Sequence, residues 1–426
     1  MGDSRLSMAM AFLLIQISLQ AALTISDISA GDSQVIDVLL IDRALFQGWS
    51  YDRMLSADPS ISVLGVPMPG HYTIAGGDDP DYMNRVMRIY MPRSYDYMRE
   101  TVDMVLLREA SCGSYDYPEV YFDAKWMQWF VRAVQEEGMS LSMWGGDACW
   151  GGLGDGNYKS WGETIVGEVL PFESLGGYNP PRPAFNDPHF IDPGHELNRL
   201  PWASAGHVEL LNRVRPKQGS TLVADAVGPG GTYPWIAWWD SGQGRVVGEA
   251  QVFGSAGGGT STMYMYNEWE WYQDFAIYLV YFGVGKPVPG DVARAHRIRE
   301  EINTHLDRAS LVISLFEFIE EFGASTATLY DELEDIDQLK ERADEFYRMD
   351  DYDSAADVFE DINAAWMELN ARAIEVKENA LIWVYVIEWF TVTAASLVAG
   401  SVLWLVMVRR RLYREMGTTR ARDLNA

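Results

Sequence analysis

The sequence predicts an α/β domain with a doubly wound, mostly parallel sheet, followed by an α-helical stalk and one C-terminal transmembrane helix. Three observations support this fold class. Short β-rich apolar runs alternate with helical segments up to about residue 290. From Asp291 to Val376 apolar residues recur at spacings of three and four, which is typical of amphipathic helices. From Ala380 to Val408 the chain is almost uninterruptedly apolar.

Residues 1–30 have the layout of a secretory signal. Arg5 precedes the apolar segment Met8–Leu23, and the small, polar stretch Ser26–Ser33 follows it. If the segment is cleaved, the body is released outside the cytoplasm on a single anchor. If it is retained, it forms a second anchor with the same placement of the body.

Residues 32–289 are expected to form the α/β domain. The runs VIDVLLID (35–42), ISVLGVPM (61–68) and VDMVLL (102–107) are continuous and apolar, as in parallel strands that are buried on both faces. The segment DAKWMQWFVRAVQEEG predicts a helix that begins after Asp123 and stops at Gly138. A fourth strand, MSLSMW (139–144), follows directly, so right-handed crossovers are expected.

A glycine-rich loop, GGDACWGGLGDG (145–156), follows the fourth strand. Ligands of open α/β sheets bind at the carboxyl ends of the strands, so this loop is the candidate ligand site. The residues assigned to ligand contact are Gly145, Gly146, Asp147, Trp150 and Gly151. The loop lacks a Gly-Lys-Ser/Thr ending, which disfavours a phosphate cradle.

The order of several segments resembles the class I glutamine amidotransferase-like superfamily, in particular its uncharacterised amidotransferase-like branch. These segments are the first strand, MSLSMWGG, the glycine loop, WGETIVGEVLPFE (161–173), DSGQGRVVGEAQVF (240–253) and EWYQDFAIYLVYF (270–282), within Val35–Gly290. The resemblance implies a flavodoxin-like doubly wound fold. In catalytic members a cysteine nucleophile lies in a Gly-x-Cys-x-Gly elbow, and Asp147 to Gly151 occupy that place here, with Cys149 as the matching cysteine and Asp147 in place of the first glycine.

A cysteine nucleophile requires a base, because a thiol of ordinary pKa is mostly protonated at neutral pH. Catalytic members carry a late His-x-Glu pair, but the segment directly after Arg245–Phe253, GSAGGGTSTMYMYNEWEW (254–271), contains no histidine. His195 and His207 are the remaining candidates for the base, and a structural or surface role is the favoured interpretation of both.

The two cysteines also permit a different interpretation. Cys112 follows the third strand and Cys149 the fourth, so both are expected at the carboxyl edge of the sheet, where an oxidising exterior would allow one disulfide. The choice between a catalytic Cys149 and a Cys112–Cys149 bridge stays open from the sequence.

Tryptophans recur near the glycine loops, where they would serve either as sugar- or peptide-stacking surfaces or as core residues. They are Trp144, Trp150, Trp161, Trp235, Trp238, Trp239, Trp269 and Trp271. Trp150 and Asp147 are the first choices for ligand contact.

Residues 291–379 predict a helical hairpin, small bundle or coiled coil. Gly323 ends its first helix, and the segment Tyr347–Phe359 looks like half of a tetratricopeptide-type pair. A stalk that provides a homo-oligomer contact is favoured over a peptide-binding groove.

Residues 380–408 predict a single membrane span, and residues 409–426 a basic tail. A buried core helix is the less favoured alternative, because such helices are usually shorter. Arg409, Arg410, Arg411 and Arg414 follow the span, so the positive-inside rule places the tail in the cytoplasm. Glu388, the one charge within the apolar run, is expected at the outer interface.

The formal net charge of −28, from 33 basic and 61 acidic residues, excludes a nucleic-acid partner. The expected partners are the cell membrane and an unidentified extracytoplasmic ligand or protein; no metal or cofactor site is predicted. Two functional hypotheses follow. The favoured one is a membrane-anchored, catalytically inactive amidotransferase-like domain that binds a ligand or assembles with a partner. The alternative is a cysteine-dependent amidase that uses Cys149.

Overall fold

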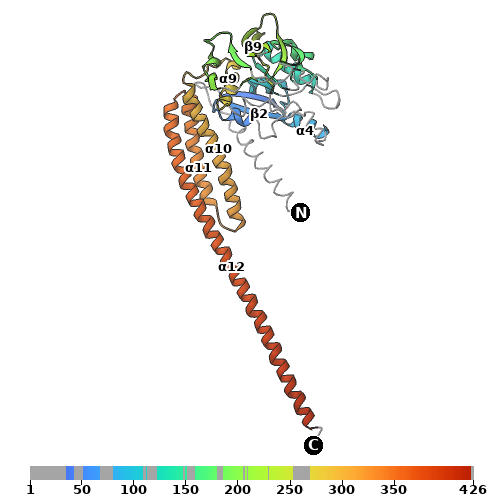
Figure 1. Ribbon diagram of the computed structural model, residues 1–426, viewed down its shortest axis with the longest axis vertical. Coiled ribbons are helices and arrows are strands. Elements are labelled where there is room, and N and C mark those ends of the chain that lie inside the picture. The colour runs from blue at the N-terminus through green and yellow to red at the C-terminus, as the bar shows by residue number, and fades with distance from the viewer. Residues whose placement is uncertain are drawn as a thin grey trace. The chain divides into compact units, whose positions relative to one another are not determined.

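The computed structural model divides the chain into two compact units, Met1–Val288 and Pro289–Ala426, each of which is described by itself (Figure 1). The residues described are 35–42, 51–67, 80–108, 112, 122–146, 149–150, 159–179, 186–204, 207–208, 210–228, 230–252 and 269–423. The predicted signal segment, residues 1–30, lies outside them.

An eight-stranded mixed sheet forms the centre of the first unit as described. Its strands, in spatial order, are β2 (Ile61–Pro67), β1 (Ile36–Asp42), β3 (Met104–Arg108), β4 (Ser140–Trp144), β10 (Gly244–Glu249), β9 (Gly231–Ser241), β8 (Thr221–Gly228) and β6 (Asp187–Phe190). The pairs from β2 to β10 are parallel, and those from β10 to β6 are antiparallel. The four strands predicted first are therefore confirmed, but the expectation of a mostly parallel sheet applies to only one half.

The antiparallel half results from short connections. Strands β9 and β10 are joined by a two-residue turn, Gly242–Gln243, in which Gly242 has a φ of 68°. A two-residue loop with a positive φ at its first position folds the chain directly back on itself, whereas a parallel pair needs a long crossover. A separate two-stranded sheet pairs β5 (Phe172–Asn179) with β7 (Leu211–Pro216).

Four of the six described helices of the first unit contact the parallel half of the sheet. The six helices are α2 (Tyr51–Ser56), α4 (Pro80–Tyr90), α5 (Tyr95–Thr101), α6 (Ala124–Glu137), α7 (Val166–Val169) and α9 (Tyr272–Val284). Those in contact with the parallel half are α2, α4, α6 and α9. Helix α9 contacts β3, β4 and β10, and nearly all of its side chains are buried. Helix α6 has the predicted ends, because the Asp123 side chain accepts from the Lys125 N–H and Gly138 closes it at a φ of 80°.

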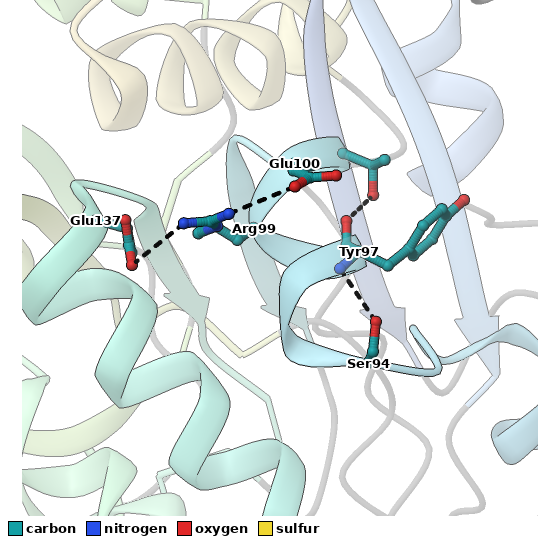
Figure 2. A network of polar contacts seen from close by, with 6 residues as sticks. Ser94, Tyr97, Arg99, Glu100 and Glu137 are labelled. Atoms are coloured by element: carbon teal, nitrogen blue, oxygen red, sulfur yellow. Dashed lines mark hydrogen bonds and ion pairs between the residues drawn. The ribbon is translucent and has the colours of Figure 1, made fainter.

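Figure 2 shows the short polar contacts at α5, one of which reaches α6. The Ser94 hydroxyl caps α5 by accepting from the Tyr97 N–H at 3.2 Å. Arg99 lies 3.4 Å from Glu100 and 4.0 Å from Glu137 of α6. These ion pairs are exposed, so each contributes at most about 1 kcal/mol.

Three helices form the second unit: α10 (Val292–Glu321), α11 (Ala327–Arg348) and α12 (Tyr352–Asp423). One buried imidazole links all three. The Nδ1 atom of His305 in α10 accepts from the indole N–H of Trp366 in α12 at 3.1 Å, and its Nε2 lies 3.5 Å from Asp337 of α11. The predicted stalk helices are confirmed, and the third continues without interruption into the apolar segment.

Helix α12 contains the one candidate membrane span among the described residues. The apolar window of its segment Tyr352–Arg414 is long enough to cross a membrane, and none of that window is buried. Ala380 is the last buried residue of α12, so the three-helix bundle ends where the apolar run begins.

Candidate functional site at the carboxyl edge of the sheet

The last residues of four neighbouring strands form one row across the sheet. In the strand register, Asp42 of β1 pairs with Arg108 of β3. Arg108 in turn pairs with Trp144 of β4, and Trp144 pairs with Glu249 of β10. Register partners on parallel strands direct their side chains to the same face. Each of the four is at most 1% exposed, so the row is a buried polar layer at the edge where α/β sheets bind ligands.

Asp42 and Arg108 form a buried ion pair within this row. One guanidinium nitrogen of Arg108 lies 3.1 Å and 3.2 Å from the two carboxylate oxygens of Asp42. The guanidinium also lies over the ring of Tyr51, at 4.0 Å from its centroid. Because both charges are removed from water, each is tolerated only while the other is present.

Two tyrosines cover the row from the adjoining helices. Tyr51 begins α2 and Tyr272 begins α9, and their hydroxyls are hydrogen-bonded to each other. The Tyr51 ring also meets Trp144 edge-on at 5.5 Å. Burial holds the pKa of Tyr272 well above its ordinary value, so its hydroxyl keeps its proton.

Glu249 ends the row at β10 and receives three N–H groups. Its Oε1 accepts from the Trp235 indole at 2.5 Å and from the Gln251 backbone at 2.8 Å, and its Oε2 accepts from the Gly145 backbone at 3.3 Å. Burial raises the pKa of Glu249 to about 8, and these hydrogen bonds oppose that shift without cancelling it. At neutral pH this carboxyl group is therefore mostly protonated.

The glycine loop begins directly beside Glu249. A Cβ atom at Gly145 would collide with the carbonyl of Gln251, so only glycine fits this close approach. Gly146 makes two hydrogen bonds with the Asn212 amide, at 2.9 Å and 2.8 Å. Gly145 and Gly146, two of the three glycines predicted for ligand contact, thus hold the start of the loop to β10 and β7.

The other predicted ligand contacts fall into two groups. Trp150 is fully buried: its indole donates to the Glu249 carbonyl at 3.1 Å and meets Phe172 edge-on, which makes it a core side chain. Asp147 and Gly151 lie outside the described residues, and their assignment stays a prediction.

The two cysteines are buried and are not bonded to each other, so the structure does not contain the bridge that the sequence left open as one of two alternatives. The Cys112 thiol is directed at the Lys159 carbonyl, 3.1 Å away. The Cys149 carbonyl accepts from the Trp161 N–H at 3.4 Å and from the Ser160 hydroxyl at 3.5 Å. Both cysteines therefore contact the same short segment, 159–161. Burial raises the pKa of the Cys112 thiol to about 12, which makes it a poor nucleophile.

The candidate histidines have contacts of their own. His195 accepts from the Leu197 N–H through Nδ1, and its ring packs against Phe190 and Phe282. Burial lowers the pKa of His195, so it is neutral at pH 7. His207 is 3.0 Å from Asp187 of β6. Neither described set of contacts shows the pairing with Cys149 that the enzyme hypothesis requires.

The arrangement offers a protonated acid, Glu249, at the start of the glycine loop. It also offers an arginine, Arg108, whose charge is compensated by Asp42. Within the described ranges no group of three or more His, Cys, Asp or Glu side chains is placed to hold a metal ion. The chemistry available from these residues is hydrogen bonding and charge recognition.

Asp42, Arg108 and Glu249 are not among the site residues predicted from the sequence. A signal was present, because each is a charged residue at the end of a buried apolar run: VIDVLLID, MVLLR and RVVGE. A charge in such a position must either find a partner or face a ligand. Only the strand order shows that the three lie in one row.

No protein-family model matches the sequence, and no match is found among curated proteins. Solved structures give weak likenesses. The cytoplasmic protein STM3548 of Salmonella typhimurium shares 14% identity at a TM-score of 0.40, over 57% of this chain and 98% of its own. The cytoplasmic protein STM1381 of Salmonella typhimurium LT2 shares 16% identity at a TM-score of 0.39. The match covers 58% of this chain and 99% of that protein.

A GH42 β-galactosidase from G. stearothermophilus shares 8% identity at a TM-score of 0.30, over 59% of this chain and 31% of the galactosidase. Likenesses of this size assign neither a fold family nor a function.

Replacement of Arg108 by Met tests the buried pair. The variant leaves the Asp42 carboxylate buried without its partner, and we expect a loss of about 3–5 kcal/mol in the free energy of unfolding. The measurement is denaturant unfolding of the full chain in detergent. The double variant Asp42→Asn/Arg108→Met removes both charges and should recover much of this loss; equal losses in the two would show that the pair is not coupled.

Replacement of Glu249 by Gln tests the raised pKa. The folded protein keeps a proton that the unfolded chain releases from about pH 4.5 upward, so stability should fall as pH rises from about 4.5 to about 8. The slope can approach about 1.4 kcal/mol per pH unit. Glu249→Gln mimics the protonated acid, and its unfolding curves between pH 5 and pH 9 should lose this slope. A wild-type chain that gains stability over the same window would contradict the raised pKa.

Proposed function

We propose that this chain is a membrane-anchored, extracytoplasmic amidotransferase-like domain that binds a ligand or partner and does not use cysteine catalysis. The burial of Cys149 is the observation that carries the proposal. Cys149 is fully buried and its backbone carbonyl accepts from the Ser160 hydroxyl, whereas a nucleophile must reach its substrate. The neutral, half-buried His195 and the Asp187-paired His207 provide further support.

The ligand site in this proposal is the carboxyl edge of the parallel strands. The glycine loop after β4 begins at Gly145, whose N–H donates to Glu249. The row of paired residues from Asp42 to Glu249 would form a rigid polar floor for the ligand. A site works best when its supporting residues are fixed before the ligand arrives. Asp147 and Gly151 remain our candidates for direct contact from the loop.

We base the proposed family on the order of the segments within Val35–Gly290. Membership in that family would imply a doubly wound arrangement of the parallel half of the sheet. The antiparallel strands β9, β8 and β6 would then be an addition at one edge. Fold alone does not determine activity, so an amidotransferase-like domain without a histidine base is compatible with a binding role.

The anchor in this proposal is the apolar segment of α12, with the arginine tail in the cytoplasm. Arg409, Arg410 and Arg411 follow the span, and Glu375 and Glu378 precede it. This charge asymmetry supports an outward body. The exposed, apolar side chains along α12 are those expected of a segment surrounded by lipid.

Thiol labelling tests the absence of cysteine catalysis. We expect brief alkylation of the native full chain in detergent at neutral pH to leave both cysteines unmodified, and unfolding without reductant to expose two reactive thiols. Intact mass and peptide mapping report the sites, and Cys112→Ser and Cys149→Ser assign them. Rapid single labelling of Cys149 in the native chain would overturn the proposal in favour of an activated thiol.

Protease protection tests the orientation. With an epitope placed after Ala426, protease added to intact cells should digest the body and leave a tagged fragment that contains the span and tail. Permeabilised cells, in which the tag must also be lost, are the control. Loss of the tag from intact cells would reverse the orientation.

A further inference from the structure

The tip of the α10–α11 hairpin has no charged residue in a chain rich in charge. From Phe322 to Tyr330 the sequence reads FGASTATLY, although 22% of all residues are charged. The rings of Phe318 and Phe322 meet edge-on at 4.8 Å, with Phe318 42% and Tyr330 38% exposed. An exposed aromatic, uncharged tip is unusual on a protein of net charge −28.

The contacts within the bundle place this tip at the start of the apolar run. Helices α10 and α12 run in the same direction, because Arg294 pairs with Asp353 and, further along both helices, His305 with Trp366. Phe322 follows His305 by 17 residues, and Trp383 follows Trp366 by the same number. At about 1.5 Å per residue on both helices, Phe322 is therefore level with Trp383.

Helix α11 independently places its end of the tip five residues nearer the start of α12, about 8 Å away along that helix. Glu332 pairs with Arg372 of α12, and α11 runs in the opposite direction, so Thr326, six residues before Glu332, is level with Glu378. Burial agrees, because Ala380 is the last buried residue of α12.

We infer that the hairpin tip, Phe318 with residues 322–330, rests in the interfacial layer of the membrane that α12 crosses. The inference depends on the proposed membrane crossing and extends it with a second contact surface. Aromatic and small uncharged residues are those that enter the headgroup region readily. The acids that flank this segment, Glu321 and Asp331, remain at the level of the polar headgroups, and the carboxylate of Glu320 accepts a hydrogen bond from the Thr326 hydroxyl.

Lipid suits this surface better than a second copy of the chain. The tip is only one helical turn plus a short connection, whereas a stable interface between proteins buries about 800 Å² on each partner. By the same spacing Phe318 is level with Asn379 and Phe322 with Trp383, next to the α12 side chains Ile382 and Trp383, which are 58% and 66% exposed. Tip and span therefore form one continuous apolar zone.

Site-directed spin labelling of the full chain in phosphatidylcholine vesicles tests the inference. A nitroxide is attached at Ser325→Cys in the tip, at Ser310→Cys higher on α10, or at Leu397→Cys within the span, and a sample without an added cysteine corrects for Cys112 and Cys149. The readout is accessibility to oxygen, which concentrates in lipid, relative to a water-soluble nickel chelate. We expect the ratio at Ser325 to be several-fold above that at Ser310 and to lie between the Ser310 and Leu397 values.

A second variant separates the contact from mere proximity. Phe318→Asp with Phe322→Asp should lower the ratio at Ser325 to the Ser310 value, whereas Leu311→Asp, on the 72%-exposed position above the tip, should leave it unchanged. A Ser325 label as accessible to nickel as Ser310 overturns the membrane contact. If the Ser325 label is poorly accessible to both oxygen and the nickel chelate and its spectrum shows dipolar broadening, the tip contacts a second copy of the chain. That result also overturns the membrane contact. A Leu397 label that is exposed to water would show that α12 does not cross the membrane. That result would overturn both the proposed anchor and the contact of the tip with the membrane.

Discussion

The buried ion pair between Asp42 and Arg108 is the constraint on which the first unit depends. Two charges at the ends of neighbouring strands are removed from water, and each compensates the other. Their contact requires β1 and β3 to be adjacent and in a single register. The Tyr51 ring under the guanidinium then positions α2, and its hydroxyl bond to Tyr272 positions the start of α9.

The same row of buried residues also holds the start of the glycine loop at the end of β10. Glu249 lies at the far end and receives the Gly145 N–H, and the Asn212 amide fixes Gly146. A protonated acid suits this place, because a full negative charge would be buried beside the already satisfied pair. The edge therefore combines a preorganised floor with a loop whose later residues carry the specificity in our proposal.

The candidate site was only partly predictable, and the reason differs from residue to residue. Gly145 and Gly146 were selected for their composition, which does mark a close backbone approach. Trp150 was selected for its aromatic ring, but a tryptophan after a strand fills the core as readily as it binds a sugar, and only burial decides. Cys112 and Cys149 meet the same segment through contacts that no spacing reveals. Asp42, Arg108 and Glu249 stand 66 and 141 residues apart along the chain, so local patterns do not connect them.

Sequence alone determined the elements whose physics is local. Continuous apolar runs established the first four strands, Asp123 and Gly138 bounded α6, and helical periodicity with a long apolar run established the stalk and the candidate span. Tertiary structure decided what depends on distant pairing. Strand order brought the charged row together, the two-residue turn at Gly242 made half of the sheet antiparallel, and side-chain packing buried Cys149. These outcomes follow from contacts between residues far apart in the chain, and such contacts leave no periodic trace in the sequence.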